Sequence, residues 1–224
     1  MRTSEKREKG LSASPTSTAE DPIVFVVDDD QLTRNSLSSL FRSVGLIVKV
    51  FESATDLLKY PLPAVPSCLI SDIRLPRLSG FELQAQLNRL GVSIPIIFMT
   101  GHGDIPMSVK AMKSGAIDFL TKPFRDQEML EAVTGALERD RERRSEEKSN
   151  SDMRTKFESL SPRERQIMSL VTAGLMNKEV AGRIGISEMT VKIHRGSVMR
   201  KMEMKSLADL VLVAEKLGVR GHVD

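Results

Sequence analysis

Along residues 22–135, segments with two different patterns of apolar positions alternate. Short apolar runs rich in β-branched residues are separated by longer stretches in which apolar side chains recur every three or four positions. This alternation predicts five strands joined by helices, and therefore a parallel sheet covered by helices on both faces. Ser79 is expected to begin the third helix, and Gly45 and Gly91 are placed to end helices. The predicted strands are 23–27, 46–50, 68–70, 94–99 and 117–120.

Only the helical period persists after about Phe157. The run SPRE at residues 161–164 combines a capping box with a proline in the first helical turn, which is a strong signal for a helix start. A turn at Gly185 separates the next two helices, and Ser187 is the expected N-cap of the second of them. The predicted helices are 162–174, 177–184, 187–202 and 206–218.

Composition divides the chain into four segments. Residues 1–21 are rich in Ser, Thr, Lys and Glu and have little to bury, so we expect a disordered tail. Residues 22–138 are predicted to form an α/β doubly wound domain, and 157–224 an all-α domain. The densely charged residues 139–156 are interpreted as a helical linker between them.

Composition also excludes several classes of protein. Cys68 is the single cysteine, which precludes a disulfide within the chain, and we interpret it as a buried core residue. Three histidines and one cysteine argue against a structural zinc site. No apolar run approaches the roughly 18 residues of a transmembrane helix, and the charged N-terminus does not resemble a signal peptide. We therefore expect a cytoplasmic protein with no membrane partner.

Acidic side chains follow two of the predicted strands. Asp28 and Asp29 come directly after the first strand, and Asp72 follows the third. If the strand order is 2-1-3-4-5, these two strand ends flank the switch point, where doubly wound sheets bind their ligands. Converging carboxylates repel one another unless a hard cation neutralises them, so the pattern predicts a Mg²⁺ site.

A hydroxyl group and an ammonium group follow two other strands, at Thr100 and Lys122. A metal ion and Lys122 would offset the charge on the oxygens of a transferred phosphoryl group, and Thr100 would donate a hydrogen bond to it. Asp72 is the natural nucleophile, because carboxylates form aspartyl phosphates. His102 is interpreted as an ordinary loop residue at the edge of this site.

Four motifs in this segment, VVDDD, SDIRLPRLSG, FMTGHGD and DFLTKPF, agree in type, order and spacing with those of receiver domains. From about residue 23 to 137 the chain therefore resembles the receiver domain of two-component response regulators, which implies a flavodoxin-like fold. The resemblance also implies a cis peptide bond before Pro123. The residues that it assigns are the acidic pair Asp28 and Asp29, the phosphoacceptor Asp72, the backbone carbonyl of Arg74 as a metal ligand, the switch residues Thr100 and Phe119, and the phosphate-binding Lys122.

The helix predicted at 187–202 is basic and follows a short helix and a tight turn. That arrangement suits the major groove of DNA. Its apolar positions Val191, Val198 and Met202 are expected to face the core. The predicted DNA-binding residues are Thr190, Lys192, His194, Arg195, Arg200 and Lys201.

Residues 160–217 resemble a LuxR-type DNA-binding domain, of the kind found in the FixJ/NarL group of response regulators. The resemblance makes Glu164 and residues 190–201 fold-determining or DNA-facing positions, and gives the last helix a role in dimerisation. Gly196 stands where some relatives carry a base-contacting lysine. We therefore expect base contacts from Lys192 and Arg195 instead.

The distribution of charge supports the assignment of metal binding and DNA binding to different halves of the chain. The total is only +3, from 33 basic and 30 acidic side chains. Residues 22–140 hold 12 basic and 14 acidic side chains, whereas 157–224 hold 11 and 8. An acidic half and a basic half are expected of a chain that binds a metal ion at one end and DNA at the other.

Together these features predict a transcription regulator that a histidine kinase phosphorylates on Asp72, with no enzymatic turnover beyond its own phosphotransfer and slow autodephosphorylation. Phosphorylation would produce a homodimer that binds promoter DNA and acts on RNA polymerase. The predicted dimerisation face comprises Met107, Lys110, Met112 and Lys113.

Three alternatives compete with this hypothesis. A phosphatase of the aspartate-nucleophile type needs a second Asp two residues after the nucleophile, where this chain has Arg74. A quorum sensor would need an aromatic-lined pocket in its sensing domain, and the chain has no Trp. A receiver that works without phosphorylation, purely as a protein-interaction module, stays open as the alternative.

Overall fold

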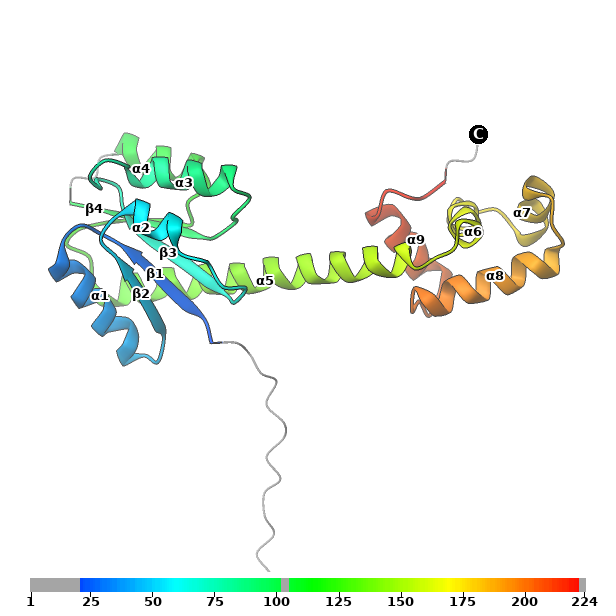
Figure 1. Ribbon diagram of the computed structural model, residues 1–224, viewed down its shortest axis with the longest axis horizontal. Helices are drawn as coiled ribbons and strands as arrows, with labels where there is room; N and C mark the ends of the chain where they lie inside the picture. Colours follow the sequence, from blue (N-terminus) through cyan, green and yellow to red (C-terminus); the bar gives the residue numbers. More distant parts are fainter. Residues whose placement is uncertain (1–20, 102–104, 222–224) are drawn as a thin grey trace, which may run out of the picture. The chain divides into compact units, whose positions relative to one another are not determined.

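The computed structural model describes residues 21–101 and 105–221, which form two compact units that divide after Glu142 (Figure 1). We call residues 21–142 the sheet domain and residues 143–221 the helical domain. Residues 1–20 of the predicted tail, and His102, lie outside the described residues. None of the helices described is long and apolar enough to cross a membrane.

The sheet domain contains five parallel strands in the order β2-β1-β3-β4-β5, which confirms the predicted fold class. Three strands, β3, β4 and β5, extend beyond their apolar runs, because the hydrogen-bonded ladder continues through polar residues. Asp72 is paired with Met99, and Thr100 with Thr121. The strands are β1 (Ile23–Val27), β2 (Ile47–Phe51), β3 (Ser67–Asp72), β4 (Ile96–Thr100) and β5 (Asp118–Thr121).

Helices cover both faces of this sheet, as the near-continuous apolar strands require. Side chains alternate along β1, so that Val24 and Val26 face α1 (Gln31–Ser43) and α5 (Asp126–Glu158). Phe25 and Val27 face the opposite layer, which contains three helices (Figure 1). These are α2 (Ala54–Lys59), α3 (Gly80–Arg89) and α4 (Ile105–Lys113).

The helix boundaries follow the local signals. Ser79 caps α3 in a full capping box with Glu82. Gly45 and Gly91, which follow the ends of α1 and α3, have φ values of 81° and 71°, in the left-handed region that favours glycine. α5 is continuous for 33 residues, so the predicted linker 139–156 lies within a helix.

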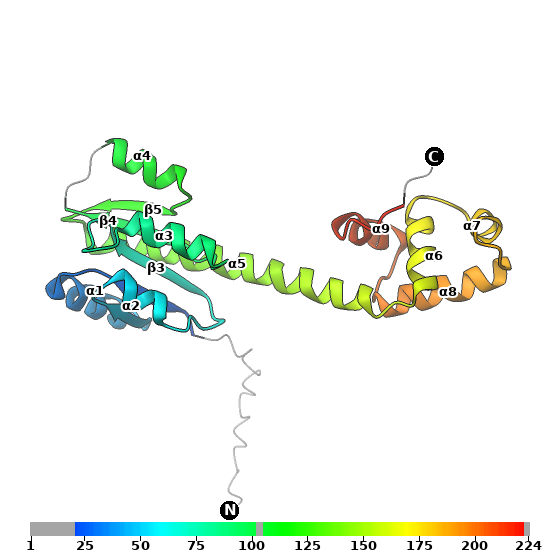
Figure 2. The ribbon, with the colours of Figure 1, turned by 45° about the horizontal axis from the view of Figure 1, so that its top comes forward.

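The helical domain contains α6 (Pro162–Thr172), α7 (Asn177–Ile184), α8 (Glu188–Lys201) and α9 (Leu207–Lys216) (Figure 2). Gly185 adopts φ 68° between α7 and α8, and Ser187 caps α8, as predicted. Val191, Val198 and Met202 are fully buried in the core between these helices. The apolar stripe of α8 therefore faces inward, and its basic residues lie on the other sides.

Candidate functional site

Three carboxylates converge at the carboxyl ends of β1 and β3. Asp28 and Asp72 are buried, whereas Asp29 is exposed. Each of the three offers an oxygen, and these oxygens lie within 4.8 Å of one another. The predicted switch point of the sheet therefore does bring these residues together.

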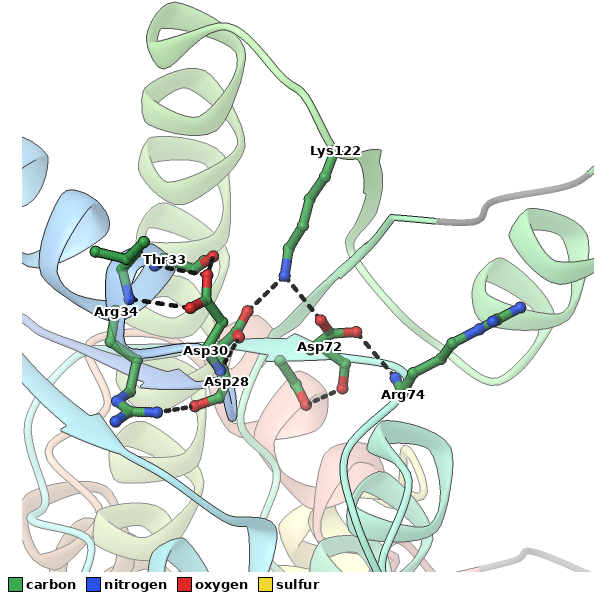
Figure 3. A network of polar contacts seen from close by, with 9 residues as sticks. Asp28, Asp30, Thr33, Arg34, Asp72, Arg74 and Lys122 are labelled. Carbon is green, nitrogen blue, oxygen red and sulfur yellow. Dashed lines mark hydrogen bonds and ion pairs between the residues drawn. The ribbon is translucent and has the colours of Figure 1, made fainter.

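Lys122 reaches into this cluster from the end of β5 (Figure 3). Its Nζ lies 2.6 Å from Asp28 Oδ2 and 2.7 Å from Asp72 Oδ2. Burial raises the pKa of Asp28 above its ordinary value, although the hydrogen bond from Lys122 opposes that effect. Burial would lower the pKa of Lys122, but hydrogen bonds to the two carboxylates outweigh it, and the net shift is upward. The ammonium group is therefore charged at neutral pH.

Backbone amides hold the other oxygen of each buried carboxylate. Asp28 Oδ1 accepts a hydrogen bond from Asp30 N at 2.8 Å, and Asp72 Oδ1 accepts one from Arg74 N at 2.9 Å. Both side chains are thus oriented by their own loops as well as by Lys122. The peptide bond between Lys122 and Pro123 is cis, as the resemblance implies.

The donor set of this cluster suits a hard divalent cation. Three carboxylates against one ammonium group leave an excess of two negative charges, and every ligand on offer is an oxygen. The backbone carbonyl of Arg74 belongs to the loop that follows Asp72, as the prediction requires. The residues present therefore fit Mg²⁺.

Thr100 and Phe119 lie on the strands beyond β3. Thr100 is buried at the end of β4, one position past the partner of Asp72, and its carbonyl accepts a hydrogen bond from Lys122 N at 2.8 Å. Phe119 is half-buried on β5, opposite Phe98. Both residues thus lie on the strands that lead to the cluster, as predicted.

Gly80 is a site residue that the sequence analysis missed. A Cβ atom at this position would lie 2.5 Å from the backbone oxygen of Asp72. Only glycine lets the start of α3 approach the end of β3 so closely. The sole sequence signal was its place next to the Ser79 cap.

The predicted dimerisation residues differ in exposure. Met107 is half-buried against the core of the sheet domain, four residues before the buried Ala111, so the two lie on the inward side of α4. Lys110 places its Nζ 4.7 Å from the ring centroid of Phe81 on α3. Lys110, Met112 and Lys113 are exposed, so three of the four predicted residues are available on the surface.

The predicted DNA-binding residues of α8 fall into two groups. Lys192 and Arg200 are exposed, whereas Thr190, His194 and Arg195 are half-buried. Arg195 Nη1 donates to Asn177 Oδ1 at 3.2 Å. Two exposed apolar side chains that the sequence analysis missed, Met189 and Ile193, lie among them at 65% exposure each.

Lys201 is bound to a buried carboxylate inside the helical domain. Its Nζ lies 2.7 Å from Glu164 Oε2, and Ser197 Oγ donates to Glu164 Oε1 at 2.6 Å. These two hydrogen bonds lower the pKa of Glu164 to about 2. Glu164 also closes the capping box of α6, so this residue joins the first helix of the domain to α8.

Comparison with protein families matches residues 24–134 to the response regulator receiver domain, and residues 158–214 to the luxR family of bacterial regulatory proteins. Nodulation protein W of Bradyrhizobium diazoefficiens is 56% identical over 207 residues, which cover 92% of this chain and 91% of that protein. Transcriptional regulatory protein FixJ of Azorhizobium caulinodans is 43% identical over 196 residues, covering 88% and 93%.

Two solved structures are similar over both domains. The response regulator StyR is 47% identical, with a TM-score of 0.80 over 88% of this chain and 99% of that one. Full-length FixJ from B. japonicum is 38% identical, with a TM-score of 0.52 over 88% and 97%.

Proposed function

This chain belongs to the two-component response regulators that join a receiver domain to a LuxR-type DNA-binding domain, and on that premise we propose that phosphorylation of Asp72 switches its binding to promoter DNA. The observation that carries the proposal is the Asp72 carboxylate, buried beside Asp28 and bound to Lys122. A cognate histidine kinase is the proposed phosphoryl donor.

The transfer itself needs few catalytic groups from this chain. An Asp72 oxygen attacks phosphorus, the phosphorus–nitrogen bond of the kinase phosphohistidine breaks, and the imidazole leaves with the electron pair and takes up a proton. Asp28, Asp29, Asp72 and the Arg74 carbonyl would hold Mg²⁺. When bound, Mg²⁺ would offset negative charge on the phosphoryl oxygens.

Phosphorylation changes the partners of Lys122 and Thr100. The Lys122 ammonium, now shared between Asp28 and Asp72, gains phosphoryl oxygens as acceptors, and the Thr100 hydroxyl donates to the same group. These new bonds draw the Thr100 end of β4 inward, and Phe119 turns into the space that is left. The surface around α4 then changes and a homodimer forms.

Dimerisation would set two copies of α8 on half-sites about one DNA turn apart. Lys192 and Arg200 are exposed and available to phosphates and base edges. Met189 and Ile193 add apolar contacts of the kind that read thymine methyl groups. RNA polymerase is the further partner through which the bound dimer would act.

The test is phosphorylation of the full chain by acetyl phosphate and Mg²⁺, followed by intact-mass analysis. Wild-type protein should gain the mass of one phosphoryl group, and Asp72→Asn should gain none. Asp126→Asn, which removes an exposed carboxylate at the start of α5, is the matched control and should react normally. Phosphorylation of the Asp72→Asn variant would show that Asp72 is not the phosphoacceptor. Equal DNA affinity of phosphorylated and unphosphorylated wild type would favour the phosphorylation-independent alternative.

A further inference from the structure

The loop that joins β1 to α1 supplies two of the three carboxylates of the acidic cluster, at Asp28 and Asp29. Asp28 is held by burial, by Lys122 and by the Asp30 amide. Asp29 is exposed, so packing does not hold its side chain. Its direction depends on the backbone that carries it.

Arg34 reaches back from the first turn of α1 to this backbone (Figure 3). Its Nη1 donates a hydrogen bond of 2.6 Å to the carbonyl oxygen of Asp28, and its own amide donates to Asp30 O at 3.1 Å. The Arg34 side chain is half-buried. A guanidinium bond of this length is charge-assisted and stronger than a neutral one.

The carbonyl of Asp28 and the amide nitrogen of Asp29 belong to the same peptide unit. Because that unit is planar, fixing its oxygen also orients the plane that carries the Cα atom of Asp29. The Arg34 bond therefore restricts the direction in which the Asp29 carboxylate leaves the chain. We propose that Arg34 is a positioning residue for the divalent-cation site, acting through the Asp28–Asp29 peptide rather than by touching the ion.

Electrostatics alone makes the opposite prediction. A guanidinium group close to the cluster repels a divalent cation, so removing its charge should tighten Mg²⁺ binding. Removing a positioning contact should weaken it, by the roughly tenfold or more that outer-shell partners of metal ligands typically contribute. The sign of the change in affinity thus separates the two effects.

The experiment is calorimetric titration of the full, unphosphorylated chain with MgCl₂. Arg34→Met, which removes both charge and donor, should weaken Mg²⁺ binding about tenfold, and Arg34→Lys, which keeps a charge and a donor, should recover part of that loss. Arg42→Met, in the last turn of the same helix, is the control for lost charge and should bind like wild type. The urea midpoint of the sheet domain is measured for all variants, so that an unfolded variant is recognised. If Arg34→Met is unfolded, the Mg²⁺ affinity of Arg34→Lys relative to wild type decides whether Arg34 positions the site.

Mg²⁺ binding by Arg34→Met that equals or exceeds wild type would overturn the inference, as would Arg34→Lys matching a folded Arg34→Met. The inference rests on the metal site of the proposed function. If wild type itself binds no Mg²⁺, that site is overturned, whereas a normal wild type with an unaffected Arg34→Met overturns the role of Arg34 alone.

Discussion

Replacing Glu164 with glutamine tests whether one ion pair, between the buried Glu164 and the exposed Lys201, holds α6 to α8. Glu164 is 5% exposed, and its pKa is lowered from an ordinary 4.5 to about 2 by its bonds to Lys201 and Ser197. At about 1.4 kcal/mol per pKa unit that shift sets an upper bound of about 3 kcal/mol on the stabilisation at neutral pH. Because the Lys201 side chain is 37% exposed, solvent screens the pair, and we expect about 1–2 kcal/mol. Glutamine keeps the shape of the side chain but loses this contribution.

The pH dependence has a definite sign. Because the folded pKa lies below the unfolded one, the stabilisation is complete above about pH 5 and disappears as pH falls toward 2. The difference in unfolding free energy between wild type and Glu164→Gln should therefore be constant near neutral pH and shrink below pH 4.5.

Methionine oxidation across a urea gradient measures this stability in the full chain. Buried Met168 and Met202 report unfolding of the helical domain, and buried Met99 and Met129 report the sheet domain. Glu164→Gln should lower the midpoint of the first pair by roughly 0.5–2 M, for a urea dependence of roughly 1–2 kcal/mol/M. The second pair should not move.

Glu179→Gln is the matched control, because Glu179 occupies the same capping-box position on α7 but is exposed. It should cost less than about 1 kcal/mol. Equal effects of the two substitutions on stability would refute the role given to the Glu164–Lys201 pair. So would a difference in unfolding free energy between wild type and Glu164→Gln that persists unchanged to pH 3.

Four further substitutions probe the two sites. Gly80→Ala should destabilise the sheet domain by about 1–3 kcal/mol, since its Cβ would lie 2.5 Å from a backbone oxygen; an unchanged urea midpoint at the sheet-domain methionines would contradict this. Lys122→Met should bind Mg²⁺ more tightly by calorimetry, because the ammonium group now occupies two of the carboxylates; weaker binding would show that Lys122 organises the cluster instead. Lys192→Ala should lower DNA affinity and reduce the salt dependence of binding by about one phosphate contact, measured by fluorescence anisotropy. A salt dependence equal to that of wild type would show that Lys192 does not contact DNA. Ile193→Ala should remove any preference for thymine over uracil in selected operators, and a preference that survives would assign that contact elsewhere.

The spacing of apolar residues and the capping residues at helix starts determined the architecture of this protein. Runs of apolar, β-branched residues specify strands that are buried on both faces, and the order of strands and helices allows few topologies. Capping residues such as Ser79 and Ser161 set helix starts to within a residue, because they satisfy orphan amides locally. The acidic cluster was also predictable, since residues at the carboxyl ends of β1 and β3 meet wherever such a sheet forms.

Contacts between distant segments were decided only by the tertiary structure. Sequence spacing placed Lys201 on a basic helix, but not beside Glu164, 37 positions earlier. The structure thus gives this predicted DNA-binding residue an ion pair within the helical domain. Likewise Met107 was predicted for the dimerisation face, and only the packing of α4 against the sheet shows that its side chain is half-buried. Gly80 and Arg34 approach single backbone oxygens, of Asp72 and Asp28, that are only eight and six residues away in the chain. Even these contacts depend on how the loop before each helix folds back onto the sheet. Local propensity is short-ranged, whereas burial and charge pairing depend on which surfaces meet.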